Sequence, residues 1–549
     1  MKSILKQLTI GIMAGIFLIS GCKNPAEDVE IVVNTDIFKS PTLIMFVNAK
    51  SNAQDPNEFA VDIIGPNADL VRTTTGGKVF KVAGGMLNLM LDRNANPSEA
   101  NPVKFTVVVN TPGFAPTFKD ISITSATTPS VVKVPMVEYA NPPQGIGSSL
   151  DTKTIAGGTT TTELQFTTAT HANMAQQAAV NVQSGTTFLD AAGQSVGGAQ
   201  LEARILYQGK APNGSVASMP GGNTSSNIIL ANGQAASGRS YFHSLGAVTI
   251  DMFAGGKEVK RFSKPLTIDL ELGNGAVDPK TRVPLTEGQT VPLWSLNEET
   301  GQWKSEGTAT VIKNANGNLI GRMQATHLST WSISYPEGER EAYICKTKIT
   351  VTRPKSDHSV SLYLYDESLS SYGLIDMNEG EASKTIEIEL PRYSQNRIFI
   401  SSLFFFSNSY TYNELSAATT PGECGSTINF DYKAKTEPTV NVALNINIKC
   451  PSKNLQTGLN ALVKINRVGA DKSDEQLFSL SQGSTSGSLI EGATYQLVAS
   501  VDGKTYTNEF TVKKEDFQLP SFPGMTGVST YNAITNTLNV SVMVIKDCN

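Results

Sequence analysis

Short runs in which apolar and polar residues alternate make up most of this chain. Alternation with a period of two places successive side chains on opposite faces of a β-strand. Many such runs at short spacing, separated by turn residues, are typical of antiparallel sandwiches. Helical periodicity is absent except around 170–180. The runs nearest the N-terminus are VEIVVN, TLIMFVNA, FAVDII, VKFTVVV, DISIT and VVKVPMVEY. The pattern predicts an all-β fold, a multidomain string of antiparallel β-sandwich modules.

Turn-rich segments divide this pattern into four β-rich units. The segment NPPQGIGSS follows the first unit, and PEGEREA follows the second. The segments YICKTKITV and LNINIKC look like equivalent first strands of the last two units. A Gly-, Ser- and Asn-rich insertion at 215–238 is predicted to be a mobile loop in the second unit. The predicted units are 30–141, 150–338, 341–437 and 438–549.

The N-terminus has the features of a bacterial export signal. Lys2 and Lys6 precede an uncharged apolar run from Leu8 to Ile19, which is too short to span a bilayer stably. We therefore assign residues 1–21 to a signal peptide. An alternative is an ordinary cleaved signal followed by an incidental cysteine.

The end of that signal, Leu-Ile-Ser-Gly-Cys at 18–22, resembles the lipobox of bacterial lipoproteins. The resemblance implies that the Cys22 thiol takes a diacylglycerol, that the chain is cut before Cys22, and that the new amine is acylated. Residues 22–29 would then be a lipidated tether, and the membrane would be a partner through this lipid. The implied location is the bacterial cell envelope, at the outer membrane.

Four further cysteines lie in the C-terminal part of the chain. An even set in an oxidising compartment favours two disulfides, and three pairings are possible. We favour Cys345–Cys424 and Cys450–Cys548, each of which would close one predicted unit. Free buried thiols are the alternative.

Charge excludes one class of partner. The formal net charge is −5, and loss of the two lysines of the signal peptide lowers it to −7. Basic runs are absent from the sequence, so we expect no nucleic-acid partner.

The three tryptophans, Trp294, Trp303 and Trp331, cluster in one segment. The sequence there is WSLNEETGQWKSEG, followed by HLSTWSI from His327. This block resembles the proteolysis-site motif that ends the autoproteolytic (GAIN) domain of adhesion receptors. It also resembles the end of the ZU-type β-sandwich of ankyrins and netrin receptors, and GTTFLDAAGQSV and GAVTIDMFAGGKEVKRFSKPLTIDL resemble the body of that sandwich. In the first unit, NTPGFAPTFKDISI resembles the closing hairpin of carboxypeptidase-regulatory-like modules, which implies an Ig-like or transthyretin-like sandwich.

The autoproteolytic resemblance implies roles for three residues. Leu328–Ser329 would be the scissile bond, and His327 would accept the hydroxyl proton of Ser329. The Ser329 oxygen would attack the Leu328 carbonyl in an N-to-O acyl shift, and water would open the ester. This chain lacks the cysteines of the receptor pattern, since Thr308 and Ala325-Thr326 stand where cysteines are expected. The alternative is structural: the tryptophans anchor the core, His327 is a hydrogen-bonded strand residue, and Ser329 lies at a turn.

Other chemical signals are weak in this sequence. Ser195 lies in a G-x-S-x-G match, but in a polar hairpin and not on a strand-to-helix turn. His171, His243 and His358 are far apart, so we expect no metal. Glu298-Glu299 and the segment 91–102 are favoured as solvated turns over Ca²⁺ ligands. We also expect no cofactor, and we interpret the aromatic run at 397–415 as a buried strand with a wet edge.

The sequence favours a lipid-anchored envelope or surface protein with a non-enzymatic adhesion, scaffold or ligand-binding role. Its ligand would be an unidentified protein or glycan. The second hypothesis is a self-processing protein cut once at Leu328–Ser329, whose fragments stay associated. The third is an accessory lipoprotein that captures glycan or peptide beside an outer-membrane transporter.

Overall fold

The computed structural model describes most of the chain from Ile31 to Ile545. The described ranges are 31–32, 39–50, 53–127, 129–143, 145–170, 176–209, 220, 224–238, 240–273, 276–279, 281, 283–338, 344–353, 360–366, 371–378, 380–391, 398–403, 409–414, 427–431, 439–451, 455–469, 476–519 and 524–545. Within these ranges the fold is all-β, as predicted, and helical structure is limited to a 3-10 turn, η1 (Ala68–Leu70), and the single residue Pro451. No helix in the described ranges combines the length and apolar character needed to cross a membrane.

The first unit is a sandwich of two four-stranded sheets, here called the N-terminal sandwich. One sheet has the order β4-β6-β2-β9 and the other β5-β3-β7-β8. Its first and last strands, β2 and β9, pair in parallel, and the other pairs are antiparallel. The strands are β2 (Lys39–Asn48), β3 (Phe59–Ile64), β4 (Val71–Thr73), β5 (Phe80–Val82), β6 (Met86–Leu91), β7 (Val103–Val109), β8 (Thr117–Ile123) and β9 (Ser130–Met136).

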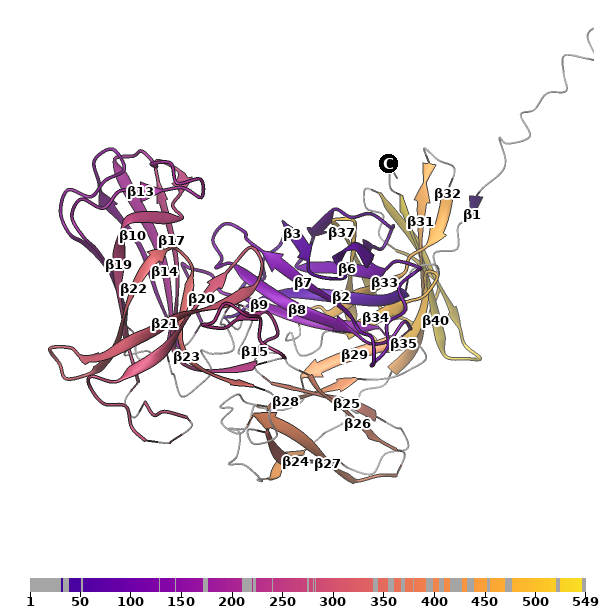
Figure 1. The fold of residues 1–549 in the computed structure, drawn as a ribbon. Helices are drawn as coiled ribbons and strands as arrows, with labels where there is room; N and C mark the ends of the chain where they lie inside the picture. Colours follow the sequence, from indigo (N-terminus) through magenta and orange to yellow (C-terminus); the bar gives the residue numbers. More distant parts are fainter. Residues whose placement is uncertain are drawn as a thin grey trace, which may run out of the picture.

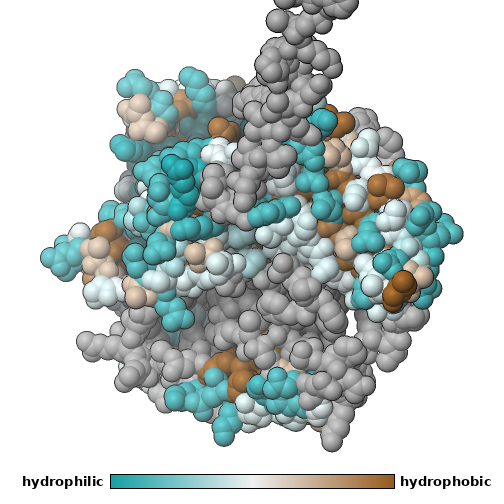
Figure 2. Space-filling view, turned by 90° about the vertical axis from the view of Figure 1, so that its right-hand side faces the viewer, coloured by the Kyte–Doolittle hydropathy of each residue, from teal (hydrophilic) through white to brown (hydrophobic). Residues whose placement is uncertain are grey.

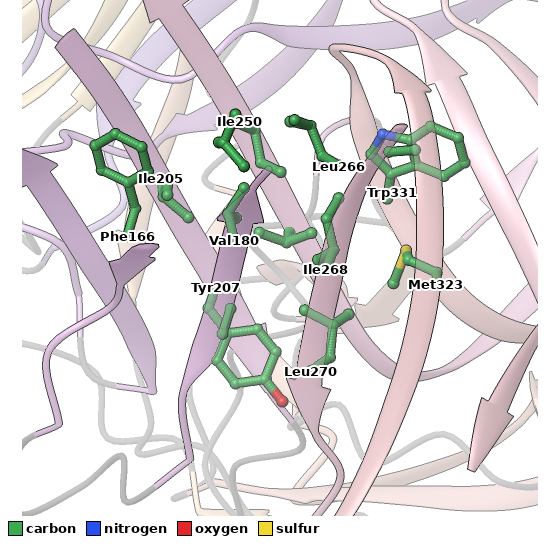
Figure 3. Packing of buried hydrophobic residues seen from close by; sticks show 14 of the residues in the cluster. Phe166, Val180, Ile205, Tyr207, Ile250, Leu266, Ile268, Leu270, Met323 and Trp331 are labelled. Carbon is green, nitrogen blue, oxygen red and sulfur yellow. The ribbon is translucent and has the colours of Figure 1, made fainter. Parts of the chain in front are cut away.

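The central unit is one 14-stranded sheet folded back on itself. Its path runs β10-β14-β17-β23-β20-β21-β22-β19-β12-β11. The strands are β10 (Ile146–Thr154), β11 (Leu164–Thr167), β12 (Ala178–Val182), β13 (Phe188–Leu189), β14 (Gln200–Gly209), β15 (Thr224–Ser225), β16 (Ile228–Ile229), β17 (Ser240–Ala254), β18 (Lys257–Glu258), β19 (Arg261–Glu271), β20 (Thr290–Asn297), β21 (Gln302–Lys313), β22 (Leu319–His327) and β23 (Thr330–Gly338). Side chains from β11, β12, β19 and β22 meet side chains from β14, β17 and β23 in its core (Figure 3).

A third unit follows, built on two sheets. The strands β27-β24-β30 form one sheet, and β26-β25-β28-β29 form part of an eight-stranded sheet. Within that larger sheet β29 pairs with β34, so the sheet runs on across the predicted boundary at 437–438. The strands are β24 (Ile344–Thr352), β25 (Val360–Asp366), β26 (Ser371–Met377), β27 (Ser383–Pro391), β28 (Ile398–Leu403), β29 (Ser409–Glu414) and β30 (Thr427–Asp431).

The last unit, here called the C-terminal sandwich, packs two sheets over a shared apolar core. One sheet has the order β1-β32-β31-β40-β39-β38, with β35 also paired to β31, and the other holds β34-β33-β36-β37. The short strand β1 (Ile31–Val32) comes from the N-terminus of the chain and pairs in parallel with β32. The remaining strands are β31 (Thr439–Cys450), β32 (Leu455–Gly458), β33 (Ala461–Arg467), β34 (Gln476–Leu480), β35 (Ser484–Ile490), β36 (Thr494–Val501), β37 (Lys504–Thr511), β38 (Phe517–Gln518), β39 (Met525–Asn532) and β40 (Thr537–Ile545).

The N-terminal sandwich lies between the central unit and the C-terminal sandwich, so the order in space is not the order in sequence (Figure 1). Its β2–β6 sheet packs on the outer face of β33, β34 and β36 through one apolar cluster. Its other sheet packs on the central unit through a second cluster, which includes Val108 and Phe118. All six residues of β6, MLNLML, are buried and do not alternate, because Leu87, Leu89 and Leu91 pack in the core of the sandwich while the other face of β6 meets the C-terminal sandwich.

Several predicted features lie outside the described residues. These are the signal peptide and Cys22, residues 215–219 and 221–223 of the insertion, His171, His358, much of the aromatic run at 397–415, Cys424, Cys548 and the side chain of Cys345. The described part of the insertion, 224–238, is not the predicted mobile loop, because β15 and β16 pair there with β17 and β21. Cys450 is described, and it is disulfide-bonded to a cysteine whose side chain is not. The pairings Cys345–Cys424 and Cys450–Cys548 therefore remain predictions.

Candidate functional site

The Leu328–Ser329 bond lies in a two-residue connection between strands that are not neighbours. Strand β22 ends at His327 and β23 begins at Thr330. In the strand order β20 and β21 lie between them, so the connection crosses from one part of the folded sheet to another. The amide of Leu328 donates to the carbonyl of Lys260 at 2.9 Å, which anchors the connection to the loop before β19.

The hydroxyl of Ser329 bonds to backbone carbonyls. Ser329 is 3% exposed, and its Oγ donates to the carbonyl of Leu296 and lies 3.2 Å from the carbonyl of Thr330. The Nδ1 of His327 instead lies 3.3 Å from the carbonyl oxygen of Leu328. A base must reach the proton that it removes. The structure therefore brings the three predicted residues together, but the Ser329 hydroxyl donates its hydrogen bond to a backbone carbonyl and not to His327.

His327 has two further neighbours. Its Nε2 lies 3.8 Å from Oε1 of Glu306, and its ring packs against Trp331 with centroids 4.8 Å apart. Glu306 also accepts from Ser295 at 2.9 Å and pairs with Lys304 at 3.0 Å. One ring nitrogen of His327 thus faces a carboxylate and the other faces the Leu328 carbonyl oxygen.

The three tryptophans are buried in two different places. Trp294 and Trp303 pack with Phe242 against the N-terminal sandwich, and the indole N–H of Trp294 donates to the carbonyl of Ser334 at 3.0 Å. Trp331 lies in the core of the central unit (Figure 3). Trp294 lies on β20, Trp303 on β21 and Trp331 on β23, so they pack on the strands that separate the two ends of the connection and on the strand that follows it.

Two carboxyl groups beside the connection have perturbed acidity. Glu298 accepts from the Thr330 hydroxyl at 3.0 Å, and burial together with the charge of Asp251 raises the pKa of Glu298 to about 8. Burial also raises the pKa of Asp251, which accepts a hydrogen bond from the Tyr139 hydroxyl. Tyr139 follows the last strand of the N-terminal sandwich. Asp251 bonds to Tyr139 at the junction of the N-terminal sandwich and the central unit, and Glu298 bonds to Thr330, the residue after Ser329. The two carboxyl groups therefore connect that junction to the predicted cleavage site.

Sequence reasoning treated Glu298-Glu299 as a solvated turn and did not single out Asp251. The structure bears out the solvated turn for Glu299, which is exposed, whereas Glu298 and Asp251 are half-buried. The sequence did contain a signal that Glu298 is not fully solvated. Glu298 lies between Trp294 and Trp303, on the turn that joins two strands with buried aromatic residues. Asp251 had no local signal, because its partner Tyr139 belongs to another unit.

The remaining candidates do not assemble a site. Ser195 forms a bridge with Leu189 in a hairpin, and His243 packs its ring on Tyr241 with centroids 4.7 Å apart. In the segment 91–102, Asp92 pairs with Arg72 at 2.9 Å. Among the residues that the structure describes, no group of three or more His, Cys, Asp or Glu side chains could hold a metal ion.

Comparisons with known proteins give distant structural similarity alone. The sequence matches no known protein family, and no curated protein matches it significantly. Similar solved structures include the TIE protein of Bacillus anthracis, at 11% identity and a TM-score of 0.14, covering 67% of this chain and 72% of that one. The shaft pilin SpaA of Lactobacillus rhamnosus GG covers 37% of this chain and 98% of its own at 11% identity and a TM-score of 0.13. The major pilin subunit BcpA of Bacillus cereus covers 72% and 99% at 9% identity and a TM-score of 0.13. At such TM-scores these likenesses carry no argument about function.

Proposed function

We propose that this chain is a lipid-anchored protein of the bacterial cell envelope with a structural, adhesive or ligand-binding role and no catalytic turnover. The lipobox-like sequence LISGC at 18–22 supports the anchor, and the stacking of the units supports the structural or adhesive role. The N-terminal sandwich is covered on one side by the central unit and on the other by the C-terminal sandwich. Apolar burial on both sides makes these units one body, which is suited to presenting surfaces away from an anchor.

Acyl labelling of the expressing bacterium tests the anchor. Growth with a labelled fatty acid should label the wild-type protein and leave Cys22→Ser unlabelled, because the substitution removes the thiol that would form the thioether. Protease treatment of intact cells then separates surface exposure from a periplasmic location. A wild-type protein that carries no label, and is released in soluble form after removal of residues 1–21, would contradict the proposal.

A second candidate is a single self-cleavage at Leu328–Ser329. The observation in its favour is the 3.3 Å approach of His327 Nδ1 to the Leu328 carbonyl. In the proposed step the Ser329 oxygen bonds to the Leu328 carbonyl carbon, the peptide C–N bond breaks, and the amine takes the hydroxyl proton. Water then releases a carboxylate at Leu328 and restores the Ser329 hydroxyl. The hydroxyl would first have to leave the Leu296 carbonyl.

A denaturing gel of the mature protein tests the cleavage. Cleavage predicts fragments of 307 residues (22–328) and 221 residues (329–549). Ser329→Ala should abolish both fragments, whereas Ser332→Ala, three residues downstream, should leave them unchanged. One full-length band from folded wild-type protein would refute cleavage. The third candidate, capture of glycan or peptide beside a transporter, needs an exposed ligand-binding surface.

A further inference from the structure

The first strand of the chain belongs to the last unit. Strand β1 pairs in parallel with β32, with Ile31 opposite Leu455 and Val32 opposite Gln456. It forms the edge of the sheet β1-β32-β31-β40-β39-β38 (Figure 1). The segment that follows the predicted lipid site is therefore fixed to the C-terminal sandwich, although the next strand, β2, belongs to the N-terminal sandwich.

The strand pairings show at which end of the sandwich the chain enters β1. Strand β31 ends at Cys450, which lies opposite Leu455, the first residue of β32. Strand β40 runs parallel to β31 and ends at Ile545, opposite Lys449. Ile31 therefore lies at the end of the sheet where β31 and β40 finish, and the backbone of β1 runs away from that end. We call it the entry end of the C-terminal sandwich.

The opposite end of the sandwich, here called the far end, lies toward the third unit. Strand β30 of the third unit ends at Asp431, and β31 begins shortly afterwards at Thr439. Strands β31 and β40 both start at the far end, where a turn joins β39 to β40. In Figure 1 the third unit, with β24 and β27, lies below the C-terminal sandwich, and β1 lies at its upper side. A membrane at the entry end would leave the third unit on the side away from the lipid.

The tether between the predicted lipid and β1 is shorter than the sandwich. Cys22 and Ile31 are nine residues apart in the sequence, so the chain between them spans at most about 30–32 Å. Strand β31, with 12 residues, is about 36–40 Å long. If the far end rested upright on the bilayer, Ile31 would lie about 36–40 Å above the lipid, beyond the reach of the tether. An anchor at Cys22 therefore excludes the inverted orientation.

Surface hydropathy alone does not select one end of the sandwich. Ile545 at the entry end is 44% exposed, and Ile534, in the turn at the far end, is 97% exposed. Figure 2, which faces this side of the molecule, shows apolar residues interspersed with polar ones on the C-terminal sandwich. Each end thus offers an isoleucine side chain to a lipid interface, and the position of the tether decides between them.

We propose that the entry end of the C-terminal sandwich docks on the membrane surface, with Ile545 at the lipid headgroups and the third unit pointing away from the lipid. Pairing of β1 with β32 brings this end within one tether length of the acylated cysteine. An apolar side chain that enters the interface there adds its burial to the anchor. This inference rests on the proposed lipid anchor and deepens it by naming the surface that faces the membrane.

The orientation depends on the pairing of β1. Without that pairing, the first strand to fix the chain would be β2, which begins at Lys39, 17 residues after Cys22. A chain of that length spans up to about 56–61 Å, which exceeds the length of β31. The tether would then no longer exclude the inverted orientation.

Photo-crosslinking in vesicles tests the proposal. The full mature lipoprotein is reconstituted into vesicles of phosphatidylethanolamine and phosphatidylglycerol that contain a radiolabelled phospholipid. Benzoylphenylalanine replaces Ile545 in one variant and Ile534 in the other, two exposed positions at opposite ends of the same sandwich. Irradiation transfers label to the end that contacts lipid. Equal thermal melting of the two variants shows that neither replacement unfolds the sandwich.

The Ile545 variant should take up about tenfold more label than the Ile534 variant, a ratio that corresponds to an orientational preference of about 1.4 kcal/mol. Addition of Ile31→Pro and Val32→Pro, which removes both backbone N–H groups of β1, should bring the ratio close to one. Ala26→Pro, in the tether before β1, is the matched control and should keep the ratio.

Equal or absent labelling at the two positions, or stronger labelling at Ile534, would overturn the proposal. A ratio that survives both proline substitutions would overturn the role of β1. Failure of the anchor has a different signature, because protein without acyl chains would not float with the vesicles. Coupling of Cys22 to maleimide-bearing lipid then supplies the anchor, and the same ratio decides the orientation.

Discussion

Asn88 and Leu462 are 374 residues apart in the sequence, yet the side chain of Asn88 bonds both backbone groups of Leu462. Its Nδ2 donates to the Leu462 carbonyl at 3.1 Å, and its Oδ1 accepts from the Leu462 amide at 2.9 Å. The same Nδ2 donates to the Ser500 carbonyl at 3.2 Å. Asn88 is 6% exposed and lies on β6, so one buried amide sets how the N-terminal sandwich meets β33 and β36.

This relationship predicts that Asn88→Ala loosens the contact between the two sandwiches. Removal of the amide leaves a buried N–H and buried carbonyls without partners, which costs about 1–3 kcal/mol. Hydrogen exchange read by mass spectrometry should show faster exchange in peptides from β33 and β36. Asn94→Ala, an exposed position in the same sandwich, is the control, and equal exchange in both variants would contradict the prediction.

Gly158 should tolerate a side chain less well than its neighbour Gly157. Both have a positive φ, of +82° and +58°, so alanine strains the backbone at either position. A Cβ on Gly158 would lie 2.0 Å from the carbonyl oxygen of Val196, whereas a Cβ on Gly157 meets nothing within 4 Å. Gly157→Ala should cost about 1 kcal/mol and Gly158→Ala about 3 kcal/mol or more. Calorimetric melting of the central unit should rank them in that order, and the reverse order would refute the steric account.

The raised pKa of Glu298 predicts that the central unit loses stability as pH rises. The carboxyl ionises near its ordinary value of 4.5 in the unfolded chain and at about 8 in the folded one. Between these values the unfolded state holds fewer protons, so the free energy of unfolding falls with increasing pH. The loss should be on the order of 2 kcal/mol, because partial solvent exposure reduces the effect.

Glu298→Gln tests this dependence directly. The variant should flatten the decline of melting temperature between about pH 5 and pH 8, because the amide does not ionise. The exposed neighbour provides the control, and Glu299→Gln should melt as the wild type does at each pH. An unchanged slope in Glu298→Gln would assign the pH dependence to another group.

Cys450 should form its bond with Cys548. Cys450 is 1% exposed at the end of β31, and β40, the parallel neighbour of β31, ends at Ile545, three residues before Cys548. Peptide mapping without reductant should recover the two cysteines in one linked peptide. Cys450→Ala should lower the stability of the C-terminal sandwich by about 2–4 kcal/mol. A linked peptide containing Cys345 or Cys424 with Cys450 would disprove this pairing.

Local sequence predicted only part of the candidate site. Adjacency in the chain guaranteed that His327, Leu328 and Ser329 lie together. It did not determine where the Ser329 hydroxyl points, because its acceptor, the Leu296 carbonyl, belongs to a strand that packs alongside only after folding. Asp251 was missed for the same reason, since its partner lies in another unit.

Local sequence was enough to predict that this protein is built of β-strands, because a pleated strand with one buried face requires apolar and polar side chains to alternate. The run MLNLML, Met86–Leu91, was not singled out as a strand, and its burial on both faces emerged from the fold. That β33 and β36 cover its outer face follows from packing between distant segments. The choice depends on which distant surfaces bury the most apolar area together, and local periodicity carries no information about that.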